Sequence, residues 1–192
     1  LGIREIPLLI ITHGHADHIA GLPGVKKDRV VKETWFQNVK QGARAEIESD
    51  RGKVNIEVLW PDSGSYDPNN SSIAVRVTTK DYSLFAGGDM EPLTQSVIAG
   101  TMRAVDIYKV CHHGSAYQDQ LFTRALSPQV AMISVGAGNS YGHPAPATLE
   151  LLAQTGAKVL RTDRDGAIAI SARNHRLKVR TSKSKLTFLR WE

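Results

Sequence analysis

The chain has 192 residues, 41% of them hydrophobic, with a formal net charge of +5 at pH 7 and a single cysteine, Cys111. This length suits one globular domain with a sizeable core, and no apolar run approaches the roughly 20 residues that a membrane-spanning helix needs. The composition therefore excludes a disulfide-stabilised scaffold and predicts a soluble domain that does not itself insert into a membrane.

Short apolar runs alternate with amphipathic segments along the chain, and we find no repeat or low-complexity linker. The runs at residues 8–12, 55–60, 73–78, 83–86, 107–110, 131–135, 158–161, 167–170 and 176–180 predict strands, and the segments 93–99, 119–125 and 147–155 predict helices. The polar interval 36–53 shows no clear pattern and reads as a loop or an uncertain helix. This alternation predicts a single layered α/β domain over residues 1–192.

The first predicted strand leads directly into a His-x-His-x-Asp-His cluster at residues 13–18. On extended backbone alternate side chains share a face, so His13 and His15 can converge on one cation. Asp17 and His18 can then serve a second cation. Capping or surface histidines would not need this order, so the cluster predicts a metal site. Imidazole combined with carboxylate suits zinc and manganese equally well.

Three more groups of polar residues follow predicted strands. Asp89 comes after a strand and two glycines, which allow a close approach of the backbone. His112 and His113 end another strand as neighbours, so only one of them would normally point at a given centre. His143 lies in a Tyr-Gly-His-Pro turn, a loop position typical of functional side chains. Taken alone, each group also fits an ordinary turn or strand end.

The positive charge is concentrated in the region 171–192, which carries seven Lys and Arg against one acid. Within it Leu177 and Val179 alternate with basic residues, and this predicts a strand with one packed face and one charged face. Such a strip could follow a nucleic-acid backbone, or its charges could protect an edge strand from aggregation. The candidate DNA-binding residues are Arg176, Lys178, Arg180, Lys183 and Lys185.

The joint order of the motifs resembles the metallo-β-lactamase superfamily. The resemblance rests on His-x-His-x-Asp-His, then Asn-Asn-Ser-Ser at 69–72, Gly-Gly-Asp at 87–89, His-His-Gly-Ser at 112–115 and Tyr-Gly-His-Pro at 141–144. More narrowly, the chain is similar to the carboxy-terminal domain of ComEC proteins, the DNA-uptake channels of bacterial competence. The resemblance covers residues 6–170 and implies an αββα sandwich. Relatives usually begin with further strands, which we expect to be absent from this chain.

The resemblance implies a centre with two divalent ions, zinc or manganese. His13 and His15 would bind the first ion, Asp17 and His18 the second, and Asp89 would bridge them.

Two positions of the implied centre stay open. The second site should be completed by His112 or His113, of which we favour His113. Many superfamily members have a Gly-His where this chain has Asn69 and Asn70, so the first site is short of one imidazole. The amide of Asn70 could act there as a weak ligand, or the position could be left to water or substrate.

The resemblance further implies a metal-dependent phosphodiesterase, a nuclease that degrades the DNA strand that is not imported. Asp17 would orient the attacking water and His143 would protonate the leaving oxygen. Ser115 would donate hydrogen bonds to phosphate, or it would simply cap the following helix. The partners would be DNA, in single-stranded form, and the membrane channel portion of a parent protein, with this domain on the extracytoplasmic side of the bacterial cytoplasmic membrane.

Two alternatives remain at the level of sequence. One is another hydrolase of the same fold, acting on a thioester or a lactam, which predicts activity on neutral esters and weak dependence on salt. The other is a non-catalytic DNA-binding domain that keeps a degenerate metal site. The asparagine in place of a histidine favours the second alternative, whereas the seven potential ligands in the family's order favour catalysis.

Overall fold

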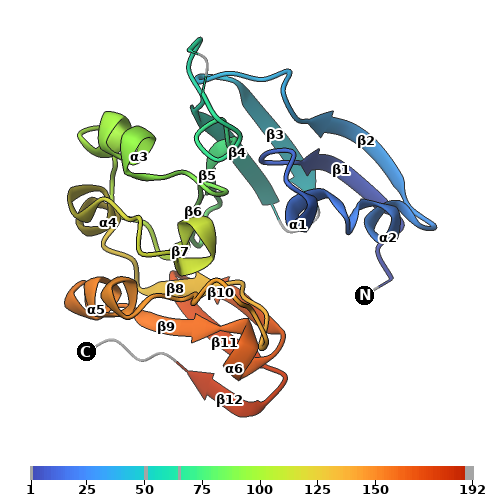
Figure 1. Ribbon diagram of the computed structural model, residues 1–192. Coiled ribbons are helices and arrows are strands. Elements are labelled where there is room, and N and C mark those ends of the chain that lie inside the picture. Colours follow the sequence, from blue (N-terminus) through green and yellow to red (C-terminus); the bar gives the residue numbers. More distant parts are fainter. Residues whose placement is uncertain (1, 50–51, 65, 189–192) are drawn as a thin grey trace.

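The structure is a computed structural model that describes residues 2–49, 52–64 and 66–188. Its middle layer is a mixed sheet, three helices cover one face of that sheet, and two smaller sheets cover the other face (Figure 1). This layered α/β arrangement is the one that the sequence predicts.

The middle sheet contains seven strands among the described residues. In spatial order they are β3 (Arg44–Ser49), β4 (Gly52–Trp60), β5 (Ala74–Thr78), β6 (Ser83–Ala86), β7 (Ile107–Lys109), β8 (Val130–Ile133) and β9 (Lys158–Arg161). Strands β3 to β6 are antiparallel, whereas β6 to β9 are parallel. The carboxyl ends of β6, β7 and β8 therefore meet at one edge of the sheet, and the segments that follow them lie close together.

Three helices form one outer layer: α3 (Pro92–Ala99), α4 (Gln120–Leu126) and α5 (Pro146–Gln154). They pack on a core in which the Phe122 ring meets the rings of Phe85 and Tyr108 edge-on, and all three side chains are fully buried. The side chain of Asp119 caps α4 by accepting a hydrogen bond from the Phe122 N–H. Cys111 is fully buried in the same core.

The other outer layer consists of two small sheets. A parallel pair, β1 (Glu5–Ile10) and β2 (Val30–Trp35), packs its apolar side chains on β4 and β5. An antiparallel meander of β10 (Ile168–Arg173), β11 (Arg176–Thr181) and β12 (Ser184–Phe188) packs on β7, β8 and β9. Short helices lie in the connections: α1 (Ala16–Ile19), α2 (Leu22–Lys26), η1 (Cys111–Gly114) and α6 (Thr162–Asp165).

The expectation of a loop or helix over 36–53 is wrong, because β3 lies within this interval. Strand β3 is an edge strand with few apolar residues, which explains its weak pattern. It is held by cross-strand ion pairs with β4, in which Arg44 is 2.7 Å from Glu57 and Lys53 is 2.6 Å from Glu46. The prediction also omits β2 and β12.

The basic strand has the predicted alternation. In β11 the side chains of Leu177 and Val179 are buried against the middle sheet. The Lys183 ammonium, in the next turn, donates a hydrogen bond to the Asp163 carbonyl. The side chain of Lys185 lies outside the described part of the chain. The basic side chains that remain at or near the surface of β11 are Arg176, Lys178 and Arg180.

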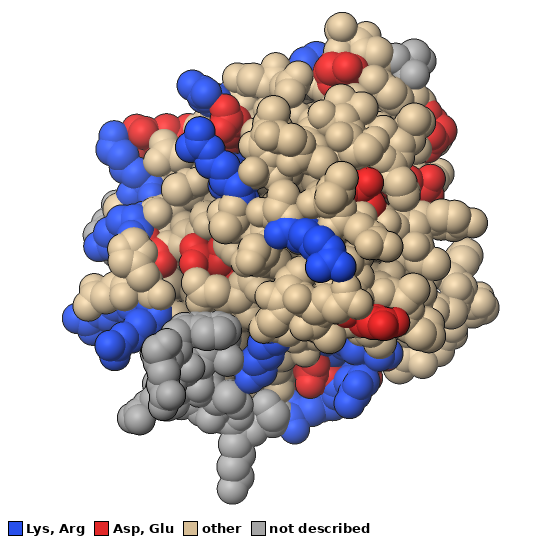
Figure 2. Space-filling view, turned by 90° about the vertical axis from the view of Figure 1, so that its left-hand side faces the viewer, with Lys and Arg blue, Asp and Glu red and all other residues tan. Residues whose placement is uncertain are grey.

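The helix-covered face of the molecule is not uniformly basic. Figure 2 shows Lys and Arg side chains gathered along its left and lower edges, whereas its centre holds mostly uncharged side chains. Within the described residues, no helix has the length and hydrophobicity required to cross a lipid bilayer.

Candidate metal centre

The ends of three strands bring the predicted ligands together. The loop after β1 and the start of α1 carry His13, His15, Asp17 and His18, the turn after β6 carries Asp89, and the segment after β7 carries two adjacent histidines. One ligand atom from each of four residues lies within 4.8 Å of every other, and these residues are Asp17, His18, Asp89 and His113. Two carboxylates and two imidazoles, drawn from distant parts of the chain, therefore share one small volume.

Asp89 lies at the middle of this cluster and is 4% exposed. Its Oδ1 is 3.2 Å from His18 Nε2 and 3.6 Å from His113 Nε2. Its Oδ2 faces the other way and is 3.9 Å from both His13 Nε2 and His112 Nε2. The two oxygens of one carboxylate thus face two different groups of imidazoles, which is the arrangement that a bridging ligand requires.

The surroundings of Asp89 favour its charged form. Burial alone would raise the pKa of this carboxyl, but the hydrogen bond with His18 and the charges of His113, His18 and His112 outweigh burial and lower the pKa from 3.8 to about 2. Asp89 is therefore an anion at neutral pH.

The histidine rings are oriented by hydrogen bonds at their Nδ1 atoms. His113 donates from Nδ1 to the Ser134 carbonyl at 2.8 Å, so its Nε2 carries the free lone pair and faces the cluster. His13 Nδ1 is 3.2 Å from the hydroxyl of Ser72, which also accepts a hydrogen bond from the Asp89 N–H at 3.0 Å. These contacts resemble the outer partners that orient histidine ligands in metal sites.

Burial favours the neutral form of His13. Burial, followed by the charge of His18, lowers the pKa of His13 from 6.5 to about 4. Its ring is therefore unprotonated at neutral pH and has a lone pair for a cation. Thr12 Oγ lies 3.2 Å from Nδ1 of His13 and 3.3 Å from Nδ1 of His18, so one hydroxyl supports both rings. His15 lies beside His13, with Nδ1 at 3.1 Å from its Nε2.

We expect Ser72→Ala to lower metal affinity by about 10–100-fold, because outer partners of histidine ligands have effects of this size. The substitution removes the hydroxyl that contacts both His13 Nδ1 and the Asp89 N–H. Metal titration followed by calorimetry measures the change. Ser96→Ala is the matched control, since this exposed hydroxyl only donates to a carbonyl within α3. Equal affinities in both variants would contradict the orienting role of Ser72.

Left-handed backbone separates the two adjacent histidines. His112 and His113 have φ values of 47° and 51°, which residues other than glycine rarely adopt. His113 joins the group that contains Asp17, at 3.2 Å from its Oδ2. His112 instead lies with Nδ1 3.2 Å from Glu91 Oε1. The two rings therefore approach Asp89 from different sides.

Two sequence-predicted residues do not face the cluster. The amide oxygen of Asn70 accepts hydrogen bonds from the Glu91 N–H and the Thr94 hydroxyl, and the side chain is buried, so Asn70 is not available as a weak ligand. Ser115 is 1% exposed and its hydroxyl accepts a hydrogen bond from the Tyr117 N–H, so the hydroxyl is not presented at the surface. Ser115 is not the cap of α4 either, because the cap residue is Asp119.

His143 borders the cluster on the side of Asp17. Its ring lies 5.7 Å from the ring of His112 and stacks on Tyr141 at 6.0 Å. Burial, followed by the charges of His112 and His113, lowers the pKa of His143. Together with Asp17 and His113 it lines an open cavity of about 320 Å³.

The residues that support the histidine rings cannot be recognised from the sequence. Thr12, Ser72 and the Ser134 carbonyl act through histidine Nδ1 atoms, and a serine or a carbonyl has no sequence signature for that role. Glu91 could be suspected of lying near the site from sequence, because it follows Asp89 by only two residues.

The residues present fit a divalent ion. Neutral imidazoles and an ionised buried carboxylate are the donors that zinc and manganese prefer. Their Nε2 and carboxylate oxygens converge, and among the described residues no Lys or Arg nitrogen lies within ion-pair distance of Asp89.

Curated relatives of the chain are bacterial competence proteins. The chain is 33% identical over 199 residues to ComE operon protein 3 of Bacillus subtilis, and this match covers 90% of the chain and 25% of the relative. It is 27% identical to competence protein ComA of Neisseria gonorrhoeae, over 87% of the chain and 25% of that protein. The chain therefore spans about a quarter of the length of these relatives, and the matches confirm the resemblance to the competence proteins.

The fold and the family agree with the geometry of the site. The structure is similar to Igni18, a metallo hydrolase of Ignicoccus hospitalis, with a TM-score of 0.53, 17% identity, and coverage of 81% of this chain and 75% of that one. The family model described as Metallo-beta-lactamase superfamily matches residues 1–136. With its ligand cluster at the strand ends of a layered α/β fold, the chain belongs to the metallo-β-lactamase superfamily.

Proposed function

We propose that this domain is a metal-dependent phosphodiesterase that cleaves DNA. The observation that carries the proposal is the convergence of Asp17, His18, Asp89 and His113 at the border of an open cavity. Two-metal centres of this kind suit in-line displacement at phosphorus, because the cations neutralise charge on the phosphate oxygens.

We further assign the ligands to two sites from the two faces of the Asp89 carboxylate. Oδ1 faces the second site, formed with Asp17, His18 and His113. Oδ2 faces the first site, formed with His13 and His15. His112 lies on this side as well, at the same 3.9 Å from Oδ2 as His13. His112 would thus supply the imidazole that the family pattern lacks at Asn70, and Glu91 Oε1 lies 3.2 Å from its Nδ1.

The chain's own residues can perform the remaining chemistry. When bound, divalent ions would supply Lewis-acid activation of water and of the phosphate. Asp17, whose side chain is 61% exposed, would orient the attacking water. His143 lines the cavity beside Asp17 and His113, and its imidazolium form would transfer a proton to the departing oxygen and become neutral. Burial lowers the pKa of His143, which makes this form a stronger acid.

We expect His143→Ala to slow turnover by about 100-fold or more while metal content stays unchanged, since general acid catalysis contributes effects of this size. His143 lies beside the cluster but makes no contact with Asp89 within ion-pair distance among the described residues. Single-turnover cleavage and elemental analysis measure the two quantities. Loss of metal in this variant would instead make His143 a ligand.

The choice of DNA as substrate is supported by the relatives and by charge. Competence proteins are the relatives that match, and they are about four times as long as this chain. We propose that the chain is one domain of such a larger protein, on the extracytoplasmic side of the bacterial membrane, and that it meets single-stranded DNA there. The exposed Arg176 and Arg180 of β11 could contact phosphates and make binding sensitive to salt.

The experiment that tests this function is cleavage of end-labelled single-stranded DNA by the purified domain with manganese, zinc or a chelator. Asp17→Ala is the inactive control. Metal-dependent cleavage that the control lacks supports a nuclease. Salt-sensitive DNA binding without cleavage would support a binding domain with a degenerate site, and cleavage of neutral esters alone would support a thioesterase or lactamase.

A further inference from the structure

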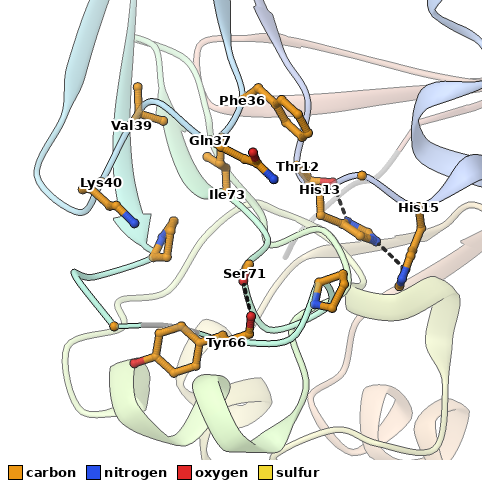
Figure 3. A pocket seen from close by; sticks show the side chains of 14 residues that line it. Thr12, His13, His15, Phe36, Gln37, Val39, Lys40, Tyr66, Ser71 and Ile73 are labelled. Carbon is orange, nitrogen blue, oxygen red and sulfur yellow. Dashed lines mark hydrogen bonds between the residues drawn. The ribbon is translucent and has the colours of Figure 1, made fainter.

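A second cavity, of about 460 Å³, lies beside the cluster, and its lining does not include Asp17, which borders the first cavity. His13 and His15 form one of its walls (Figure 3). Its volume falls within the range of about 300–1,000 Å³ that small-molecule sites have. The cavity is thus continuous with the proposed first metal site.

The segment after β2 supplies one side of the cavity. Trp35 ends β2 with its side chain buried, and the next residue, Phe36, is half-buried and lines the cavity. A Cβ atom added at Gly14 would lie 3.8 Å from Phe36 Cζ, so the ring reaches the backbone between His13 and His15. The Phe36 N–H donates a hydrogen bond to Asn38 Oδ1, which fixes the turn.

The loop after β4 supplies the opposite side. Tyr66 lies across the cavity from Phe36 in Figure 3. Its ring packs on the buried Trp60 at 4.8 Å, and its hydroxyl donates a hydrogen bond to Asp62. The Ser71 hydroxyl donates to the Tyr66 carbonyl. Tyr66 therefore forms a fixed aromatic wall.

Polar groups complete the lining, and they follow Phe36 along the chain in the same order as the parts of a nucleotide. Gln37 offers an amide near Phe36, and Lys40 offers an ammonium group on an exposed part of the same segment. An aromatic face, an amide and a cation correspond to the face of a base, its polar edge and a phosphate.

We propose that this cavity binds the nucleoside next to the cleaved phosphodiester, with the base stacked on Phe36 and a neighbouring phosphate at Lys40. This inference rests on the proposed nuclease function. A base in the cavity must leave the base stack, so the site selects single-stranded DNA over duplex DNA. Stacking is available to every base, so the subsite is tolerant of sequence.

The experiment compares two fluorescein-labelled oligomers of equal length and charge, oligothymidylate and an oligomer of abasic sugar phosphates. With manganese we expect the wild-type domain to cleave oligothymidylate with a kcat/KM about tenfold higher than the abasic oligomer, because stacking contributes this much per base. Phe36→Ala should bring the ratio of the two kcat/KM values close to one, by lowering that of oligothymidylate more than that of the abasic oligomer. Phe36→Trp should keep it.

Fluorescence anisotropy with a chelator separates this inference from the proposed function. Tighter binding of oligothymidylate than of the abasic oligomer, lost in Phe36→Ala, supports the subsite even if neither oligomer is cleaved. Cleavage of both oligomers at equal rates overturns the subsite and leaves the nuclease in place. An equal loss on both oligomers in Phe36→Ala also overturns it, since that result assigns Phe36 to the general support of the metal centre.

Discussion

Asp89→Asn should reduce metal-dependent cleavage by more than about 100-fold, a loss larger than changes to outer partners cause. The asparagine keeps the shape of the side chain but removes the charge that faces four histidines. Without this charge the two groups of imidazoles lose their shared anionic ligand, so we expect metal content to fall as well. Elemental analysis and cleavage of labelled DNA measure the two effects.

Asp28→Asn is the matched control for this experiment. Asp28 is exposed and has a φ of 58°, a conformation that asparagine also tolerates. This variant also loses one carboxylate charge, but it loses it at an exposed position outside the ligand cluster. If Asp89→Asn retained full metal content and activity, the bridging assignment would be wrong.

Gly88→Ala should unfold the metal centre and lower the stability of the whole domain. Gly88 has a φ of 56°, and a Cβ atom there would lie 2.7 Å from Ser72 Oγ and 2.8 Å from Thr12 Cβ. The left-handed conformation costs about 1–2 kcal/mol with a side chain, and overpacking adds about 1–3 kcal/mol. The displaced hydroxyls are those that contact His13 and His18, so metal affinity should fall with the free energy of unfolding.

Gly100→Ala provides the comparison for Gly88→Ala. Gly100 follows α3 with a φ of −66°, and a Cβ atom there meets nothing within 4 Å. In denaturant unfolding of the metal-free variants, the unfolding midpoint should decrease strongly for Gly88→Ala and hardly at all for Gly100→Ala. Similar midpoints for the two variants would show that the turn before Asp89 tolerates a side chain.

The sequence predicts most of the middle sheet because its strands have a strong local signal. The predicted strands 83–86 and 158–161 coincide with β6 and β9, and α3, α4 and α5 agree within one residue at each end. These elements are buried and apolar, with Pro, Gly or Asp at their ends. Strand β3 has no such signal, because its stability depends on charges of its neighbour β4.

The candidate site is predicted only in part for a related reason. The ligand types and their order can be read from the sequence because each follows a strand. The side to which His112 and His113 point depends on a left-handed backbone at both positions, which is uncommon for any residue other than glycine. The Asn70 amide oxygen is engaged elsewhere, because it accepts hydrogen bonds from the Glu91 N–H and the Thr94 hydroxyl, and both partners are distant in sequence.

The proposed ligands belong to two different layers of the fold. His13 and His15 follow β1 of the small parallel sheet, whereas Asp89 and His113 follow strands of the middle sheet. A cation bound by these residues would therefore cross-link a two-stranded unit and the rest of the domain, and its binding free energy would stabilise the packing of the layers. Depletion of metal would favour local opening of β1 and β2 before global unfolding, so metal supply would govern the lifetime of the folded protein as well as its chemistry.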